Sequence, residues 1–301
     1  MQEAVGSIKY RFDFLKYRYL WLAISVIYFI VGIAAYVVRG GFNYHIDFTG
    51  GAEIRVSFQS PVPIGRVRDA INKGGWSDSV IQSIGTSQKE FIIRVADMDE
   101  NTEPAIKKAL ASSITDSPVH IDNVEWVGAE AGKDTVRRAA LAIMLCLVIL
   151  LIYIAIRFEF RFGIGAVACL LHDILAVIVF LLISGEAVSL HVLASLVAVL
   201  GYSINDTIVV FSKIRENFKK YKGVSEYDLA NLSINQTLRR TILTSAATTL
   251  SVLAILFLGG ETLRGLALVM LVGIIVGTYS SIYIASPTML AIKRKRLFGN
   301  I

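Results

Sequence analysis

Six long apolar runs constrain the fold of this chain more than any other feature of its sequence. A helix that crosses a bilayer needs about 20 largely apolar residues. Runs of about that length lie at residues 19–38, 139–156, 162–184, 190–211, 242–258 and 266–292. With 54% hydrophobic and 18% charged residues, the chain is too apolar for an ordinary soluble domain. The sequence therefore predicts an α-helical polytopic membrane protein with six transmembrane helices.

The loops between these runs differ in charge, and the difference predicts an orientation. Basic residues gather in segment 1–18, beside residues 157–161, in loop 213–238 and in tail 293–301, whereas loops 185–189 and 259–265 carry one arginine between them. The positive-inside rule then places both termini in the cytoplasm and segment 39–138 outside. Because the Lys and Arg residues adjoin apolar runs, the net charge of +6 indicates membrane anchoring, and we expect no nucleic-acid binding. Loop 213–238 is either a surface-lying amphipathic helix or a solvated loop.

The external segment 39–138 is polar and has a pattern of its own. Alternating strand-like residues lie at 52–58, 80–86, 90–96 and 119–127, and helix-like residues lie at 64–73 and 103–114. The order βαββαβ is that of a ferredoxin-like domain. We therefore expect a ferredoxin-like α+β external domain between the first and second transmembrane helices, followed by a five-helix transmembrane region over residues 139–292.

Asp206 is the first candidate functional residue, because it lies inside the fourth apolar run. An ionisable group at membrane depth is costly and indicates ion or proton movement. Tyr202 and Ser203, one turn earlier, are expected to hydrogen-bond it, and Asn205 and Thr207 extend the polar band. The alternative is an aspartate that only packs helices together through hydrogen bonds.

His172 and Asp173 lie near the middle of the third run, as far from water as this chain places any charge. An imidazole beside a carboxylate can share its proton, so a relay is one interpretation. A polar pair that fixes helix register is the other. Adjacent residues on a helix point about 100° apart, and no further His or Cys follows at a suitable spacing, so we expect no metal site.

Arg240 opens a polar stripe on the fifth run. Thr244, Thr248 and Ser251 follow it at i+4, i+8 and i+11, so all four lie on one helix face. Such a stripe indicates either a helix interface or a hydrated path. We expect Arg240 to act as a positive partner of Asp206, since both lie toward the cytoplasmic side.

Gly273 and Gly277 form a small-xxx-small face on the sixth run, which predicts close helix packing. The two cysteines, Cys146 and Cys169, lie in apolar runs and predict no disulfide framework. No phosphate-binding glycine loop or Ser/His/Asp set stands out, so we expect no enzyme activity and no cofactor. A gradient or a partner would have to supply energy.

Longer motifs follow one another in a fixed order along the chain. They are IDFTGG at 46–51, GYSINDTIVV at 201–210, KIREN at 213–217, NQTLRRT at 235–241, GGETLRG at 259–265 and YSSIYIA at 279–285. Together they resemble SecF, a family of membrane subunits that work with SecD in protein export. The chain departs from the family pattern at His45, which replaces a glycine, at Ser212-Lys213, and over residues 127–132.

The resemblance implies a proton-driven auxiliary subunit of the Sec preprotein translocase in the cell inner membrane. It implies a helix arrangement similar to the resistance-nodulation-division transporters. The implied partners are SecD, the SecYEG channel, YajC, the emerging preprotein and the lipid bilayer. The family's functional carboxylate and arginine correspond to Asp206 and Arg240. Two other functions stay open at this point, a proton-coupled small-molecule exporter and a non-transporting scaffold for SecD.

Overall fold

The computed structural model describes residues 10–85, 87–96 and 101–292, so the predicted basic tail 293–301 and the first half of segment 1–18 lie outside the described residues. The chain divides into two compact units. One comprises Tyr44–Leu141, and the other comprises Met1–Asn43 together with Ala142–Ile301. Each unit has its own hydrophobic core.

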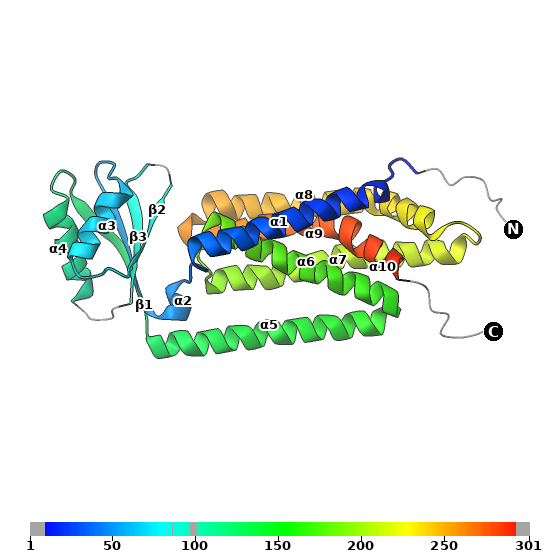
Figure 1. Cartoon of the computed structure of the whole chain (residues 1–301), viewed down its shortest axis with the longest axis horizontal. Helices are drawn as coiled ribbons and strands as arrows, with labels where there is room; N and C mark the ends of the chain where they lie inside the picture. Colours follow the sequence, from blue (N-terminus) through cyan, green and yellow to red (C-terminus); the bar gives the residue numbers. More distant parts are fainter. Residues whose placement is uncertain (1–9, 86, 97–100, 293–301) are drawn as a thin grey trace. The chain divides into compact units, whose positions relative to one another are not determined.

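All six predicted spans lie in long apolar helices, which confirms the predicted fold class. Figure 1 labels the helices of the chain. Those of the membrane unit are α1 (Arg18–Arg39), α5 (Ala129–Arg157), α6 (Phe160–Ser184), α7 (Leu190–Lys220), α8 (Glu226–Leu258), α9 (Gly260–Ser280) and α10 (Ser286–Ala291), with a short 3₁₀ helix before α1 (Leu15–Tyr17) and a π-helix, Ser281–Ala285, between α9 and α10.

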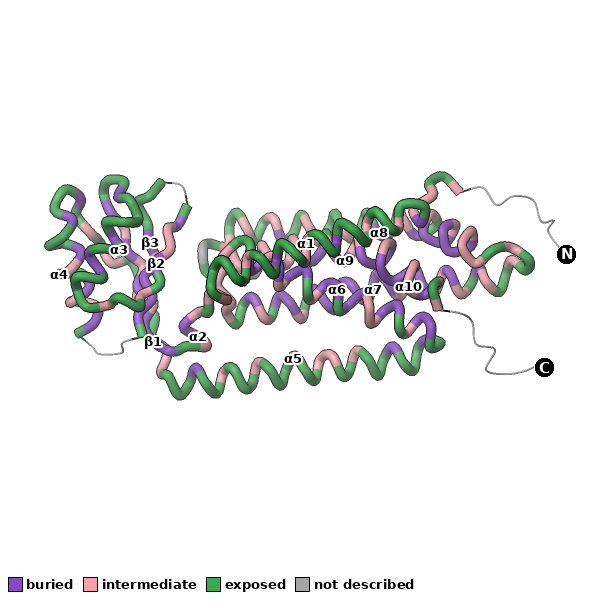
Figure 2. Tube along the Cα trace, viewed as in Figure 1, coloured by how far each residue is buried: buried purple, intermediate pink, exposed green. Residues whose placement is uncertain are grey.

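Helices α6, α7 and α9 form the centre of the membrane unit and pack against one another. They bury much of their surface, whereas α1, α5 and α8 remain largely exposed (Figure 2). Phe158, Phe162 and Phe211 pack their rings edge to face and tilted at the end of this core. Because lipid solvates exposed apolar side chains, the outer helices need no protein cover.

The segment treated above as loop 213–238 is helical except at residues 221–225. Helix α7 continues to Lys220 and α8 starts at Glu226, so the two form a hairpin that extends past their apolar runs. The buried Asn217 explains the extension, since its amide donates to Ser233 at 2.7 Å and to Gln236 at 2.9 Å. These bonds join the two helices with polar contacts that hydropathy does not register.

The hairpin also binds the N-terminal segment. The Asn235 side chain accepts from the backbone N–H of Phe12 at 3.0 Å and donates to its carbonyl at 2.8 Å. One turn earlier, Asn231 accepts from the N–H of Phe14 at 3.0 Å and donates to Asp13 at 2.7 Å. Two asparagines at i and i+4 on α8 thus hold an extended backbone beside them.

The other unit has the predicted order βαββαβ. Its elements are β1 (Gly51–Phe58), α3 (Ile64–Lys73), β2 (Val80–Ile84), β3 (Glu90–Val95), α4 (Thr102–Ser113) and β4 (Val119–Val127), preceded by a one-turn helix α2 (Ile46–Thr49). The antiparallel sheet has the strand order β2-β3-β1-β4, which is the split arrangement of ferredoxin-like domains. Alternate residues of β1 and β3 enter one core with the apolar faces of α3 and α4. The opposite face of β1 carries Glu53 and Arg55.

Candidate functional site

Asp206 lies in the middle of α7 and is 8% exposed, so most of its surface is inside the helix bundle. Its Oδ1 accepts a hydrogen bond from Thr241 Oγ1 at 2.6 Å, and its Oδ2 accepts one from Ser281 Oγ at 2.6 Å. The two hydroxyls come from α8 and from the π-helix. A hydroxyl can donate to a carboxylate or accept from a carboxylic acid, so this site can satisfy either protonation state.

The π-helix places Ser281 at this site. A π-turn inserts an extra residue into a helix and is frequent at functional sites. Ser281 is fully buried at its first position, and the Ser286 hydroxyl donates to the Ser281 carbonyl at 3.1 Å. The predicted continuous sixth span is therefore interrupted where it meets Asp206.

The residues predicted to support Asp206 have other positions. Tyr202 bonds the Ser245 hydroxyl at 2.7 Å, Ser203 donates to Asp173, and Asn205 is exposed. The reason is geometric, because hydroxyls on two other helices reach the carboxylate of Asp206 more directly than residues on its own helix. Thr241 and Ser281 were the residues that sequence reasoning missed. The only signal for them was a polar residue beside Arg240 and a serine pair in an apolar run.

Asp173 forms a second buried acid site and has no exposed surface. It accepts a short hydrogen bond from the Ser203 hydroxyl, and its Oδ2 lies 3.8 Å from Cys169 Sγ. Its Oδ1 lies 3.2 Å from Nδ1 of His172, whose Nε2 lies 3.0 Å from Ser25 Oγ on α1. The predicted pairing of these two residues is therefore extended by hydroxyl groups from two further helices.

The two acid sites adjoin along the contact between α7 and α9. Cys169 lies 3.1 Å from Ser280 and 3.5 Å from Thr207, which are the chain neighbours of Ser281 and Asp206. In each helix, one residue therefore belongs to the Asp206 site and its chain neighbour contacts Cys169, which lies beside Asp173. Among the described residues, no hydrogen bond joins the Asp206 site directly to the Asp173 site.

Arg240 is exposed and forms no direct ion pair with Asp206 in the described part of the chain, but it is close enough to act on that carboxylate electrostatically. The stripe that follows points out of the bundle. Thr244 and Thr248 donate to backbone carbonyls one turn earlier at 3.0 and 2.9 Å, as Ser251 does at 3.1 Å. The structure therefore separates this polar face from the buried hydroxyls.

Two glycines allow α9 to approach α7. A Cβ built on Gly273 would lie 2.1 Å from a methyl carbon of Val199, and one on Gly277 would lie 3.0 Å from the Ser203 Cβ. Neither position has space for a larger side chain without a shift of the helices. This close approach brings the end of α9 to the two acid sites.

The ferredoxin-like unit contains a partly buried carboxylate of a different kind. Glu53 Oε2 accepts from Arg94 Nε at 2.6 Å and lies 3.1 Å from His45 Nε2. Burial disfavours the charged form of His45, but its hydrogen bonds with Asp47 and Glu53 outweigh burial and raise the pKa of His45 to about 9. Burial likewise opposes the Glu53 carboxylate, but His45 and Arg94 outweigh it and lower its pKa to about 2.

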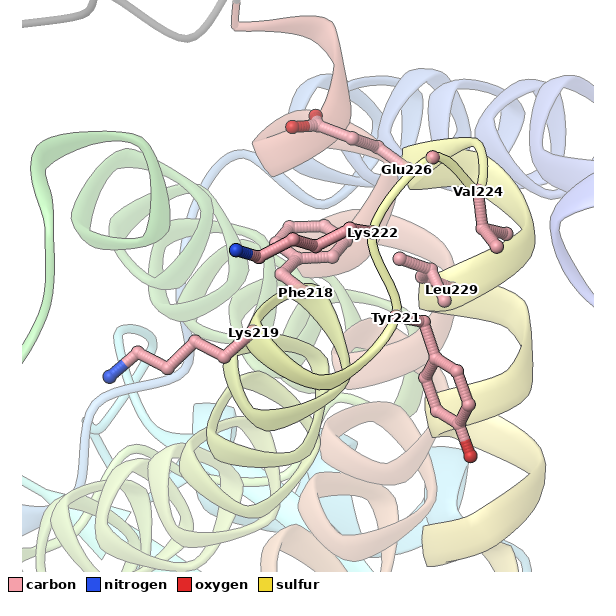
Figure 3. A pocket seen from close by; sticks show the side chains of 8 residues that line it. Phe218, Lys219, Tyr221, Lys222, Val224, Glu226 and Leu229 are labelled. Atoms are coloured by element: carbon pink, nitrogen blue, oxygen red, sulfur yellow. The ribbon is translucent and has the colours of Figure 1, made fainter. Parts of the chain in front are cut away.

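An open pocket of about 640 Å³ lies at the hairpin between α7 and α8, and its lining includes Phe218, Tyr221 and Leu229 (Figure 3). Lys219 and Lys222 extend to the same side in this view. The pocket is lined by α7 residues that follow Asp206 by more than three turns, so it is separate from the acid sites. Within the described residues, no group of three His, Cys, Asp or Glu side chains could hold a metal ion.

Comparisons with known proteins give one consistent family. Residues 105–295 match the model of the family described as protein export membrane protein SecD/SecF, C-terminal. The protein translocase subunit SecF of Thermodesulfovibrio yellowstonii is 40% identical over 96% of this chain and 97% of that protein. The subunit of the same name from Pseudomonas aeruginosa is 34% identical over 96% and 93% of the two chains.

Two solved structures are similar over nearly the whole chain. The crystal structure of SecDF from Thermus thermophilus, described as a translocon-associated membrane protein, matches with a TM-score of 0.84 and 33% identity over 96% of this chain. SecDF in its super-membrane-facing form matches with a TM-score of 0.67 and 33% identity over 97% of this chain. This chain spans 39% and 40% of those longer chains.

Proposed function

The chain belongs to the SecF family of protein translocase subunits, and from that membership we propose that it works with SecD to couple the proton motive force to protein export. It is an auxiliary, multi-pass membrane subunit of the Sec system. The observation that supports proton coupling is the Asp206 site, a buried carboxylate held by hydroxyl groups from two other helices.

Protonation and deprotonation of Asp206 each reverse the direction of one hydrogen bond. In the carboxylate state, Thr241 and Ser281 both donate to Asp206. When Oδ2 is protonated it becomes a donor, and the Ser281 oxygen accepts from it. The Ser281 proton then turns to the Thr278 carbonyl, which already lies 3.0 Å from Ser281 Oγ. Ser281 is therefore the hydroxyl whose hydrogen bonding reports the proton state of Asp206.

The gradient supplies enough energy for such a step. Moving one charge across a membrane is worth about 2.3 kcal/mol per 100 mV. A difference of about 1.4 kcal/mol already changes an equilibrium tenfold. Protonation of Asp206 can thus bias two arrangements of α7, α8 and the π-helix, because all three meet at its carboxylate.

The proposed topology has both termini in the cytoplasm and the ferredoxin-like unit outside. It follows from the basic residues beside the helix ends, including Arg157, Arg161 and Lys213. The outward polar face of α8, which begins at Arg240, supports SecD as the neighbour that covers it. We further propose SecYEG, YajC and the emerging preprotein as partners, and transport without covalent catalysis.

Preprotein export into inverted vesicles tests this function. Asp206→Asn and Arg240→Met are each compared with wild type, with and without an uncoupler. The proposal expects Asp206→Asn to abolish the gradient-dependent part of export, and Arg240→Met to reduce it. Glu216→Gln is the matched control, because that carboxylate is exposed on the same helix and pairs with Lys213 at 2.8 Å. Two variants that match wild type and stay uncoupler-sensitive would refute the site assignment.

A further inference from the structure

Helix α1 contacts the bundle through few buried residues. Only Ser25 and Gly32 are buried along its length. Gly32 packs without a side chain against Val179, so a Cβ there would lie 2.3 Å from a Val179 methyl carbon. Ser25 is 5% exposed and is the polar one of the two. Its side chain is therefore the buried polar group of α1 that can form hydrogen bonds with the bundle, beside the half-buried Tyr28, which donates to the Ala176 carbonyl at 3.2 Å.

Ser25 joins α1 to two other helices. Its Oγ lies 3.0 Å from His172 Nε2 on α6 and 2.6 Å from the Tyr279 hydroxyl on α9. The Tyr279 hydroxyl also donates to the backbone carbonyl of Trp21 on α1 at 2.8 Å. A continuous hydrogen-bonded chain thus runs from Asp173 through His172, Ser25 and Tyr279 to the backbone of α1.

We propose that Ser25 is a positioning residue that transmits the proton state of the His172–Asp173 pair to helix α1. The inference rests on the proposed proton-coupled function and deepens it. It assigns to α1, which leads directly into the external unit, a defined response to the buried pair.

The transmission follows from the donors and acceptors in the chain. With a neutral imidazole whose Nδ1–H faces Asp173, Nε2 is an acceptor and Ser25 donates to it. When the pair gains one proton, both ring nitrogens become donors, and Ser25 Oγ must accept from Nε2. The Ser25 proton then turns to the Tyr279 oxygen, and Tyr279 donates to the Trp21 carbonyl. One added proton thus reverses the bond between His172 and Ser25 and turns the Ser25 hydroxyl toward Tyr279, with no covalent bond broken elsewhere.

The pair is surrounded by groups that carry no fixed charge. Ser203 from α7 and Cys169 from α6 face Asp173, and Phe29 from α1 and Tyr279 from α9 lie beside the imidazole with ring centroids 5.4 and 5.5 Å away. Tyr279 and Cys169 are the other titratable groups in this environment. No Lys, Arg or further carboxylate bonds to these groups in the described part of the chain. The hydrogen-bond direction at Ser25 therefore depends on the pair itself.

The outer end of α1 is also attached, so a change at Ser25 has a route outward. Arg39, the last residue of α1, donates to the Ile183 carbonyl at 2.9 Å, and Asn43 donates to the Gly185 carbonyl at 3.1 Å. The Val188 N–H donates to the Asn43 carbonyl at 2.7 Å. These bonds hold the segment that follows α1 on the loop between α6 and α7. Strand β1 of the external unit begins eight residues beyond Asn43, at Gly51.

Nitrogen NMR of histidine in proteoliposomes tests the inference, because the chain contains only four histidines and His172→Gln assigns the signal. In wild type, acidification is expected to change the His172 Nε2 from acceptor to donor. In Ser25→Ala the Nε2 signal is expected to differ from wild type before and after acidification, because the ring loses its hydroxyl partner. The same variant is expected to lose the gradient-dependent part of export. Ser25→Thr, which keeps the hydroxyl, restores both.

The outcomes separate this inference from the proposed function. A Ser25→Ala variant with the wild-type Nε2 signals, or with wild-type gradient-dependent export, overturns the inference. If Asp206→Asn in the same assay still removes gradient-dependent export, the function stands. If Ser25→Ala fails to insert into the membrane, the same two measurements are made on Tyr279→Phe, which removes the hydroxyl that follows Ser25 in the hydrogen-bonded chain. Ser112→Ala is the matched control, because that exposed hydroxyl bonds to a carbonyl of its own helix α4, that of Ala109 at 3.0 Å.

Discussion

The ferredoxin-like unit and the membrane unit surround carboxylates with opposite kinds of partner. Glu53 lies between two cationic side chains, His45 and Arg94. Asp206 lies between two hydroxyls, Thr241 and Ser281. Arginine and protonated histidine can only donate hydrogen bonds, so the Glu53 site is compatible only with the charged carboxylate. Hydroxyls can donate or accept hydrogen bonds, so the Asp206 site is compatible with both the carboxylate and the carboxylic acid.

The difference indicates which carboxylate can change its charge during transport. A carboxylate compensated by cations stabilises a fold, because losing its charge removes an ion pair from each of those cations. A carboxylate compensated by hydroxyls can change its charge while every polar atom keeps a partner. The Asp173 site belongs to the second kind, since Ser203 and the shared proton of His172 face it. The Glu53 cluster is thus built around fixed charges, whereas the Asp206 and Asp173 sites are built around groups that can donate or accept.

Glu53→Gln should give the largest effect on stability. The variant removes the carboxylate that pairs with the buried Arg94 and with His45, and removing one partner of a buried ion pair costs about 3–5 kcal/mol. Pulse proteolysis of the external unit in the full chain measures this loss. Asp116→Asn is the control, because its bidentate pair with Arg66 is exposed and contributes little. A Glu53→Gln unit as resistant as wild type would show that the cations do not need the carboxylate.

The pH dependence of the external unit should follow from the same cluster. The pKa of His45 is raised from 6.5 to about 9, so its contribution is complete below pH 6.5 and is lost as the pH rises through about 9. The pKa of Glu53 is lowered from 4.5 to about 2, so its contribution is complete above pH 4.5 and is lost as the pH falls toward 2. Hydrogen exchange of β1 and β3 should show the alkaline loss, on the order of 3 kcal/mol. His45→Gln should remove it, and an unchanged alkaline profile in that variant would contradict the assignment.

Ser281→Ala should have a smaller effect, on transport. It removes the hydroxyl that reverses with the proton on Asp206, and the loss of one hydrogen bond of about 1.4 kcal/mol lowers the gradient-driven rate about tenfold. Thr241→Val keeps the shape of the side chain and removes the other hydroxyl. It should reduce the rate less, because the proposed reversal of hydrogen bonding takes place at Ser281, which has the Thr278 carbonyl as a second acceptor. The reverse order would place the changing hydrogen bond at Thr241.

Hydropathy and alternation were sufficient to predict the helices and the order of the sheet, because burial in lipid or in a small core dictates both patterns. They did not predict elements that depend on particular side-chain bonds. The α7–α8 hairpin depends on the buried amide of Asn217, and helix α2 follows His45, whose Nδ1 lies 3.1 Å from the carboxylate of Asp47 in the first turn. The π-helix at Ser281 has no periodic signal at all.

The candidate site was predictable only in part for a similar reason. Asp206 could be found because a charge in an apolar run is conspicuous. Its partners could not, since spacing along α7 suggested Tyr202 and Ser203, whereas the hydroxyls that reach it come from other helices. Spacing describes one helix face and cannot identify which neighbour packs against it. The roles of Asp206, Arg240 and the His172–Asp173 pair in proton movement remain predictions.

Infrared difference spectroscopy of the full chain in lipid, recorded between alkaline and acidic pH, tests the central claim most directly. Hydroxyl-held Asp206 should gain a protonated-carboxyl C=O band that Asp206→Asn removes and Ser281→Ala shifts, whereas Glu53→Gln should leave that band in place. A difference spectrum that Asp206→Asn leaves unchanged would show that this carboxylate keeps one charge throughout, and would contradict the account.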